Sequence, residues 1–140
     1  MTTSPVGVPR YALAWLVSPF PGAFLQAMVV AFWPKPGQGV FEHPGSMFAA
    51  ICILIWALEL VFGLPLLLLL RRRGLASWRA YAMTGTISVA APLAPVILWT
   101  FARGSVSLYA LVYDLAFLAL AGFLAGAAFW TLTRPDRHLA

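Results

Sequence analysis

The chain has 140 residues, of which 62% are hydrophobic and only 9% are charged. A soluble domain carries about 25% charged residues, so this composition excludes an ordinary soluble domain and indicates a single integral membrane domain over residues 1–140. The net charge of +5 does not indicate a nucleic-acid partner, because the basic residues cluster at the ends of apolar runs, which is a membrane-topology pattern.

Four apolar segments have the length that an α-helix needs to cross a bilayer, about 20 residues. They cover residues 11–33, 47–70, 80–101 and 108–132. The sequence therefore predicts an all-α fold, a polytopic four-helix transmembrane bundle.

The first apolar segment is interrupted near its middle by two prolines. Pro19 and Pro21 have no N–H to donate to the carbonyls of Trp15 and Val17. We therefore expect a helix that is kinked or broken at Pro19–Pro21, with backbone carbonyls that need other polar partners. The interruption is either a simple kink or a functional discontinuity of the kind that transporters use at substrate sites.

The second apolar segment contains one ionisable residue, Glu59, and ends at three arginines, residues 71–73. Glu59 is twelve residues from Met47, about 18 Å along a helix, so it is expected near the middle of the bilayer. Apolar surroundings favour the neutral form of a carboxyl group, which then needs a hydrogen-bond acceptor. Pro65 predicts a mild bend further along the segment.

The same depth, counted in the other segments, brings further polar groups to the level of Glu59. In the first segment the count reaches Pro21, close to Pro19, and in the third it reaches Val89, beside Ser88. The hypothesis is a polar layer made of Glu59, Ser88, Pro19 and Pro21. It acts as a hydrogen-bonded lock or as a proton or cation site, unless Glu59 faces a partner subunit instead.

A second polar cluster is predicted nearer the opposite surface. Asp114 is six residues from Leu108, about 9 Å along a helix, and Gln26 lies at a similar depth. Arg103, in the preceding turn, has a side chain long enough to reach toward Asp114. Together with the Glu59 layer, the cluster Gln26, Asp114 and Arg103 would form the outer half of a polar path across the membrane. No strongly polar group continues this path inward from Glu59.

Helix packing is predicted at small residues, because lipid supplies no hydrophobic drive for helices to associate. Gly122 and Gly126 form a GxxxG pair in the fourth segment, on a stripe that extends back to Asp114. The third segment offers small residues at a spacing of four: Ala82, Thr86, Ala90 and Ala94.

The basic residues predict the orientation. With four spans, both termini and the loop after the second segment share one side, which carries Arg10, Arg71, Arg72, Arg73, Arg79, Arg134 and Arg137. The other side carries Lys35 and Arg103. This bias predicts that both termini lie in the cytoplasm and that the protein is a multi-pass component of the inner (plasma) membrane.

The sequence carries no recognisable catalytic motif. It contains no GxxxxGK[ST], HExxH or GxSxG pattern, its histidines His43 and His138 fall on opposite sides of the membrane, and Cys52 is the only cysteine. We therefore expect no enzymatic activity, no cofactor and no metal. The expected function is that of a structural or accessory subunit, with the lipid bilayer and other membrane subunits or further copies as partners. The alternative is a small oligomeric proton- or cation-coupled transporter that uses Glu59.

Overall fold

The computed structural model describes residues 8–33 and 42–133, and this part of the chain is helical with short connections. The elements are α1 (Val8–Val17), α2 (Phe20–Phe32), α3 (Pro44–Leu58), the π-helical turn η2 (Glu59–Gly63), α4 (Leu64–Arg72), α5 (Trp78–Ala102) and α6 (Leu108–Thr133). They form four segments that are long and apolar enough to cross a membrane: α1–α2, α3–η2–α4, α5 and α6. The all-α fold and the four apolar segments are thus confirmed.

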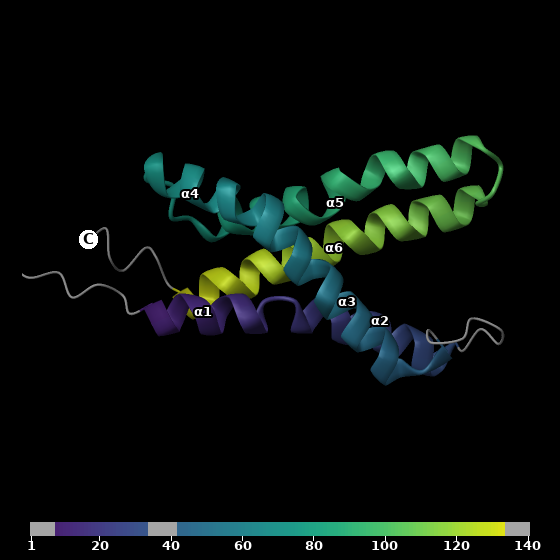
Figure 1. Ribbon diagram of the computed structural model, residues 1–140, viewed down its shortest axis with the longest axis horizontal. Coiled ribbons are helices and arrows are strands. Elements are labelled where there is room, and N and C mark those ends of the chain that lie inside the picture. The colour runs from purple at the N-terminus through teal and green to yellow at the C-terminus, as the bar shows by residue number, and fades with distance from the viewer. Residues whose placement is uncertain (1–7, 34–41, 134–140) are drawn as a thin grey trace, which may run out of the picture.

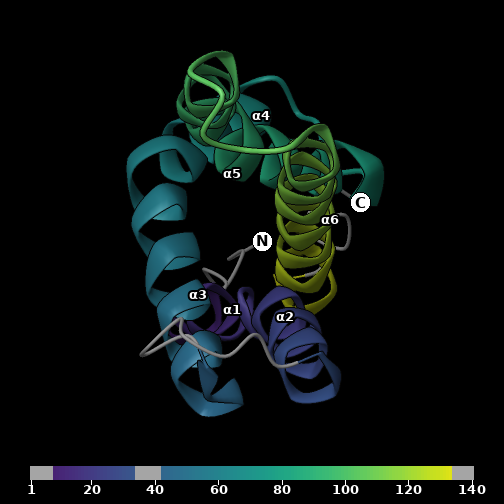
Figure 2. The same ribbon diagram turned by 90° about the vertical axis from the view of Figure 1, so that its right-hand side faces the viewer.

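The segments run back and forth, so that the start of α1, the end of α6 and the α4–α5 turn lie at one end of the molecule (Figure 1). Hydrogen bonds connect these parts: Arg10 Nε donates to the Leu132 carbonyl and Trp130 Nε1 to the Ala76 carbonyl, both at 2.7 Å. Seen end-on, α2 lies between α3 and α6 and contacts both (Figure 2). The α5–α6 turn lies at the opposite end.

This arrangement separates most of the described basic residues from the α5–α6 turn. The end with the α4–α5 turn carries Arg10, Arg71, Arg72, Arg73 and Arg79. Arg103 lies in the α5–α6 turn at the other end. Lys35, Arg134, Arg137 and His138, which also entered the prediction of orientation or function, lie outside the described residues.

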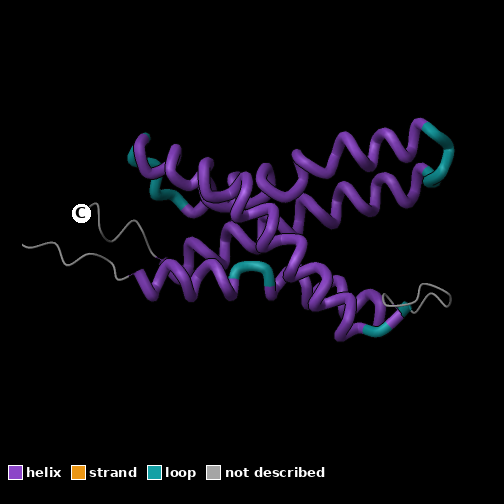
Figure 3. Tube along the Cα trace, in the orientation of Figure 1, coloured by secondary structure: helices purple, strands orange, loops and turns teal. Residues whose placement is uncertain are grey.

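The first segment is broken at Ser18–Pro19 (Figure 3). Helical bonding runs up to the break, where the Ser18 N–H donates to the Ala14 carbonyl at 2.9 Å, and resumes where the Ala23 N–H donates to the Pro19 carbonyl at 2.9 Å. Pro21 lies in the first turn of α2, where a missing N–H costs no helical bond. The break therefore begins one residue before the predicted Pro19–Pro21 range.

The second segment contains a π-helical turn just before Pro65, where the sequence predicts only a mild bend. In η2 the Leu64 N–H donates to the carbonyl of Glu59, five residues earlier, and Pro65 follows in the first turn of α4. Proline cannot supply the bond that an interior helical position needs, and a π-helical turn just before it accommodates that loss. Glu59 is the first residue of this wide turn.

Glycine ends the second segment at the α4–α5 turn. Gly74 has φ +66°, and the Leu75 N–H beyond it donates to the Leu70 carbonyl at 3.0 Å. This is the C-terminal capping arrangement that glycine favours, because other residues are strained at positive φ. Ser77 then caps the start of α5, its Oγ accepting from the Ala80 N–H at 3.3 Å.

The closest pair of helices, α5 and α6, meets at three glycines. A Cβ atom on Gly122 would overlap the carbonyl of Gly85, and one on Gly126 would overlap the carbonyl of Tyr81. Gly122 and Gly126 thus lie at a helix–helix contact inside the chain. Gly85, which the stripe of four small residues in the third segment did not include, is their partner.

The apolar core lies where α3, α5 and α6 meet. It consists of Ile55, Leu58, Val89, Leu118, Ala121 and Ala125. Half of these residues come from α6, whose small side chains bring the helices close together.

Candidate functional site

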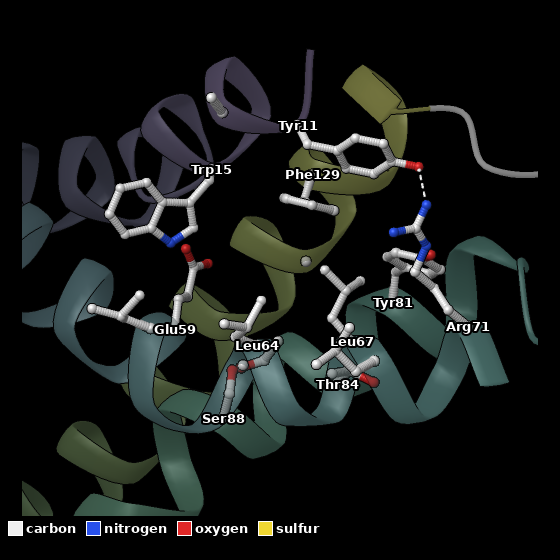
Figure 4. Close-up of a pocket in the computed structure, with 16 residues that line it drawn as sticks. Tyr11, Trp15, Glu59, Leu64, Leu67, Arg71, Tyr81, Thr84, Ser88 and Phe129 are labelled. Carbon is white, nitrogen blue, oxygen red and sulfur yellow. Dashed lines mark hydrogen bonds between the residues drawn. The ribbon is translucent and has the colours of Figure 1, made fainter. Parts of the chain in front are cut away.

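A cavity of about 520 Å³ lies among α1, η2, α4, α5 and α6 (Figure 4). This volume is within the range of small-molecule binding sites, about 300–1,000 Å³. We call it the Glu59 cavity. Its lining includes Tyr11, Trp15, Glu59, Arg71, Ser88 and Phe129.

At one end of the Glu59 cavity, the carboxyl group is connected to the break in the first segment. Ser18 Oγ lies 2.8 Å from Glu59 Oε2 and 2.8 Å from the carbonyl oxygen of Trp15, which Pro19 leaves without its usual helical partner. Ser18 Oγ is the donor in both contacts, so its single proton is shared between the Trp15 carbonyl and the Glu59 carboxyl oxygen. Ser18 thus connects the carbonyl freed at the break with the acid of the second segment.

The predicted polar layer is assembled in part. Glu59 and Ser88 line the same cavity, but the Ser88 hydroxyl donates to the Gly85 carbonyl of its own helix at 3.0 Å. Pro19 is fully buried at the break, whereas Pro21 is exposed. The partner that the structure gives Glu59 is Ser18, which sequence reasoning missed although its position directly before Pro19 placed a hydroxyl beside a freed carbonyl.

A second contact holds the same break against α3. The Trp56 indole N–H donates to the Leu16 carbonyl at 3.2 Å, and the Trp56 ring lies 6.3 Å from that of Trp15. Backbone acceptors in an apolar environment need such partners, since no water replaces them. Two side chains from the second segment, Glu59 and Trp56, thus contact the end of α1 and the break that follows it.

The other end of the Glu59 cavity is closed by a cation and an aromatic ring. Arg71 Nη2 donates to the Tyr11 hydroxyl at 3.1 Å, and the guanidinium carbon lies 4.8 Å from the centre of the Tyr11 ring (Figure 4). The Phe129 ring packs beside this pair. Its centre lies 6.2 Å from the centre of the Tyr11 ring and 6.2 Å from that of the Tyr81 ring. In the sequence, Arg71 was recognisable only as part of a topology signal.

A second cavity, of about 540 Å³, lies nearer the other end of the molecule, and we call it the Asp114 cavity. It is lined by Gln26, Met47, Ile51, Ile97, Asp114, Phe117 and Leu118. Gln26 Oε1 accepts from the Tyr113 hydroxyl at 2.9 Å. Two members of the predicted outer cluster thus share a cavity. Arg103, the third, stacks on Trp99 in the α5–α6 turn, with 3.8 Å between its guanidinium carbon and the ring centre.

The apolar core separates the two cavities. On each of three helical segments, a core residue lies between a residue that lines the Glu59 cavity and a residue that lines the Asp114 cavity. Ile55 falls between Ile51 and Glu59 in the second segment. The same order holds in α5 for Val89, between Ser88 and Ile97, and in α6 for Ala121, between Leu118 and Gly126. Each cavity therefore presents one carboxyl group on its own side of the core.

The fold and these cavities define a protein with four helical segments of membrane-spanning length and two separated cavities, each with one carboxyl group. Comparisons with protein-family models, with curated proteins and with solved structures gave no match.

Proposed function

We propose that the protein is a multi-pass component of the inner (plasma) membrane with both termini in the cytoplasm. The described arginines support this orientation, because five of them gather at the end that holds the α4–α5 turn. Basic residues are enriched in the cytoplasmic loops of membrane proteins. In this orientation the Glu59 cavity faces the cytoplasm and the Asp114 cavity faces the outside.

We further propose that it is a small proton- or cation-coupled transporter, acting as an oligomer, in which Glu59 is the titrating group. The observation that carries this proposal is the pair of cavities, each with one carboxyl group, on opposite sides of the apolar core. Ionisable residues at membrane depth are costly and commonly mark ion or proton pathways. The Glu59 cavity extends from Glu59 to Arg71 and would give a proton or cation access to Glu59 from that side.

The surroundings of Glu59 support a residue that changes state. It lies at the first position of the π-helical turn and contacts Ser18 at the break between α1 and α2. Both are irregular backbone segments of the kind found at functional sites in helices and transporters. In this scheme Glu59 exchanges a proton for a cation: it is neutral when it carries the proton, and loss of the proton leaves a carboxylate that binds a cation in the cavity.

Proton flux in proteoliposomes tests the proposal. Vesicles carrying the purified chain and an internal pH-sensitive dye receive an outward gradient of Na⁺ or K⁺, and the internal pH is recorded. The wild type should couple the cation gradient to proton movement, and Glu59→Gln should abolish that coupling because the amide cannot titrate. Glu42→Gln, which alters an acid outside both cavities, should behave as the wild type. Equal flux for the wild type and Glu59→Gln would refute the transport proposal.

The second candidate function is a structural or accessory subunit of a membrane complex. It is favoured by the large apolar side chains on the outside of the second segment, where Ile53 is 63% exposed, Leu60 57% and Val61 60%. A partner helix or lipid would cover this face in a membrane. The flux experiment separates the two candidates, since an accessory subunit gives no more proton movement than empty vesicles.

A further inference from the structure

We propose that the Glu59 cavity binds an anionic amphipath with a single head, its apolar chain lying along α4 and its anionic group at Arg71 and Tyr11. The cavity has the length for this ligand. Glu59 and Arg71 are twelve residues apart on one helical segment, about 18 Å. Half of a ~30 Å hydrocarbon core is about 15 Å, which is the depth that one lipid chain occupies. This inference concerns binding and does not depend on transport.

The wall of the cavity fits an acyl chain and lets it enter sideways. Leu60, Leu64 and Leu68 line the cavity, yet they are 57%, 48% and 50% exposed. Side chains that face both a cavity and the outside lie at an opening. In a membrane this opening faces the lipid chains, so an amphipath enters from the bilayer without its chain crossing water.

The end of the cavity at Arg71 fits an anionic head. The guanidinium group has five N–H donors, of which the structure assigns one to the Tyr11 hydroxyl. Tyr11 accepts that bond, so its own O–H proton is available to a ligand. Within the described part of the chain, no carboxylate pairs with Arg71. A phosphate or carboxylate group would therefore find a cation with unused donors and a hydroxyl donor beside it.

At the opposite end of the cavity, near Glu59, the ligand needs no polar group. Glu59 and Ser18 contact each other, and Ser88 donates to Gly85. Among the described residues, no buried side-chain nitrogen or oxygen lacks a hydrogen-bond partner. The far end of the ligand thus meets polar groups that are already paired, which selects a chain that ends in a methyl group rather than a ligand with two polar ends.

Photolabelling tests the inference. The purified full-length chain in a neutral detergent is irradiated with palmitic acid that carries a diazirine at its chain end, and labelled peptides are identified by mass spectrometry. We expect labels on peptides that line the cavity near Trp15 and Glu59. Arg71→Gln should reduce labelling about tenfold, the effect of losing one hydrogen bond to a charged group. Arg72→Gln, the matched control, removes the next arginine, which does not line the cavity.

A second pair of variants tests the chain site without changing any charge. Leu67→Trp fills the cavity and should reduce labelling, whereas Leu69→Trp, at an exposed position outside the lining, should not. Unlabelled palmitate or phosphatidylglycerol should compete, and the stronger competitor identifies a free fatty acid or a bilayer lipid as the source. Equal labelling of Arg71→Gln and Arg72→Gln, or equal competition by zwitterionic phosphatidylcholine, would overturn the inference.

Discussion

Ser18 is the residue on which the break in the first segment and the acid of the second segment converge. Its side chain is fully buried and lies within 2.8 Å of both the Trp15 carbonyl and the Glu59 carboxyl group. A buried carbonyl without a donor is costly, particularly where water is absent. Ser18 thus lets the chain break at Pro19 without leaving that carbonyl unpaired, and the same hydroxyl fixes Glu59.

Replacing Ser18 by Ala should lower the stability of the fold. The variant leaves the Trp15 carbonyl without its donor and Glu59 without its partner, and one such loss costs about 1–3 kcal/mol. Unfolding in mixed micelles with increasing sodium dodecyl sulfate, followed by circular dichroism, measures the change.

The control for Ser18→Ala is Ser105→Ala, at an exposed position in the α5–α6 turn. A surface change of this kind should stay within about 0.5 kcal/mol of the wild type. If both variants unfold at the same detergent concentration, the hydrogen bonds of Ser18 contribute nothing to stability.

At the scale of elements, α5 and α6 are the regular and closely packed pair of the molecule, and the first two segments are irregular. Gly85, Gly122 and Gly126 let the α5 and α6 backbones touch. The first segment is broken and the second contains the π-helical turn. A movement that opens or closes the Glu59 cavity is therefore expected in α1 and α4, against a fixed α5–α6 pair.

The variant Gly122→Ala should separate α5 from α6 and destabilise the fold. Its methyl group would meet the backbone of Gly85, which cannot turn away as a side chain can. Overpacking of this kind costs about 1–3 kcal/mol. The same unfolding assay measures the effect.

Gly45→Ala is the matched control for Gly122→Ala. Gly45 lies in the first turn of α3, and a Cβ atom added there meets no atom within 4 Å. Because alanine favours a helix over glycine by up to about 1 kcal/mol, this variant should be neutral or slightly more stable. Equal destabilisation by the two substitutions would contradict the role of close packing at Gly122.

At the scale of the whole molecule, the alternation of four segments places the α4–α5 turn and the start of α3 at opposite ends (Figure 1). The proposed orientation puts the α4–α5 turn in the cytoplasm. It follows from the group of arginines at that end, and it decides which cavity opens to which side.

Labelling of single cysteines tests this orientation. In a Cys52→Ala background, Leu75→Cys marks the α4–α5 turn and Gly45→Cys marks the start of α3. A membrane-impermeant maleimide applied to intact spheroplasts should label Gly45→Cys, whereas Leu75→Cys should react only after the membrane is opened. The reverse pattern would show that the termini lie outside.

The sequence by itself determined the features that depend on local hydrophobicity and on proline. The four segments, their ends within a few residues, and the break near Pro19 follow from the length of apolar runs and from missing N–H donors. The depth of a residue along its segment could also be predicted, because each residue of an α-helix adds 1.5 Å to its length. That is why Glu59 and Ser88 were placed at one level, and they do line one cavity.

Only the tertiary structure decided which groups meet at that level. Counting along a helix gives depth but not the direction in which a side chain points, and segments that are apolar all round give little sign of their rotation. The wide turn η2 adds a rotation that no hydropathy pattern records. For this reason Glu59 contacts Ser18 rather than Ser88, and Arg71, which read only as a topology signal, closes a cavity against Tyr11.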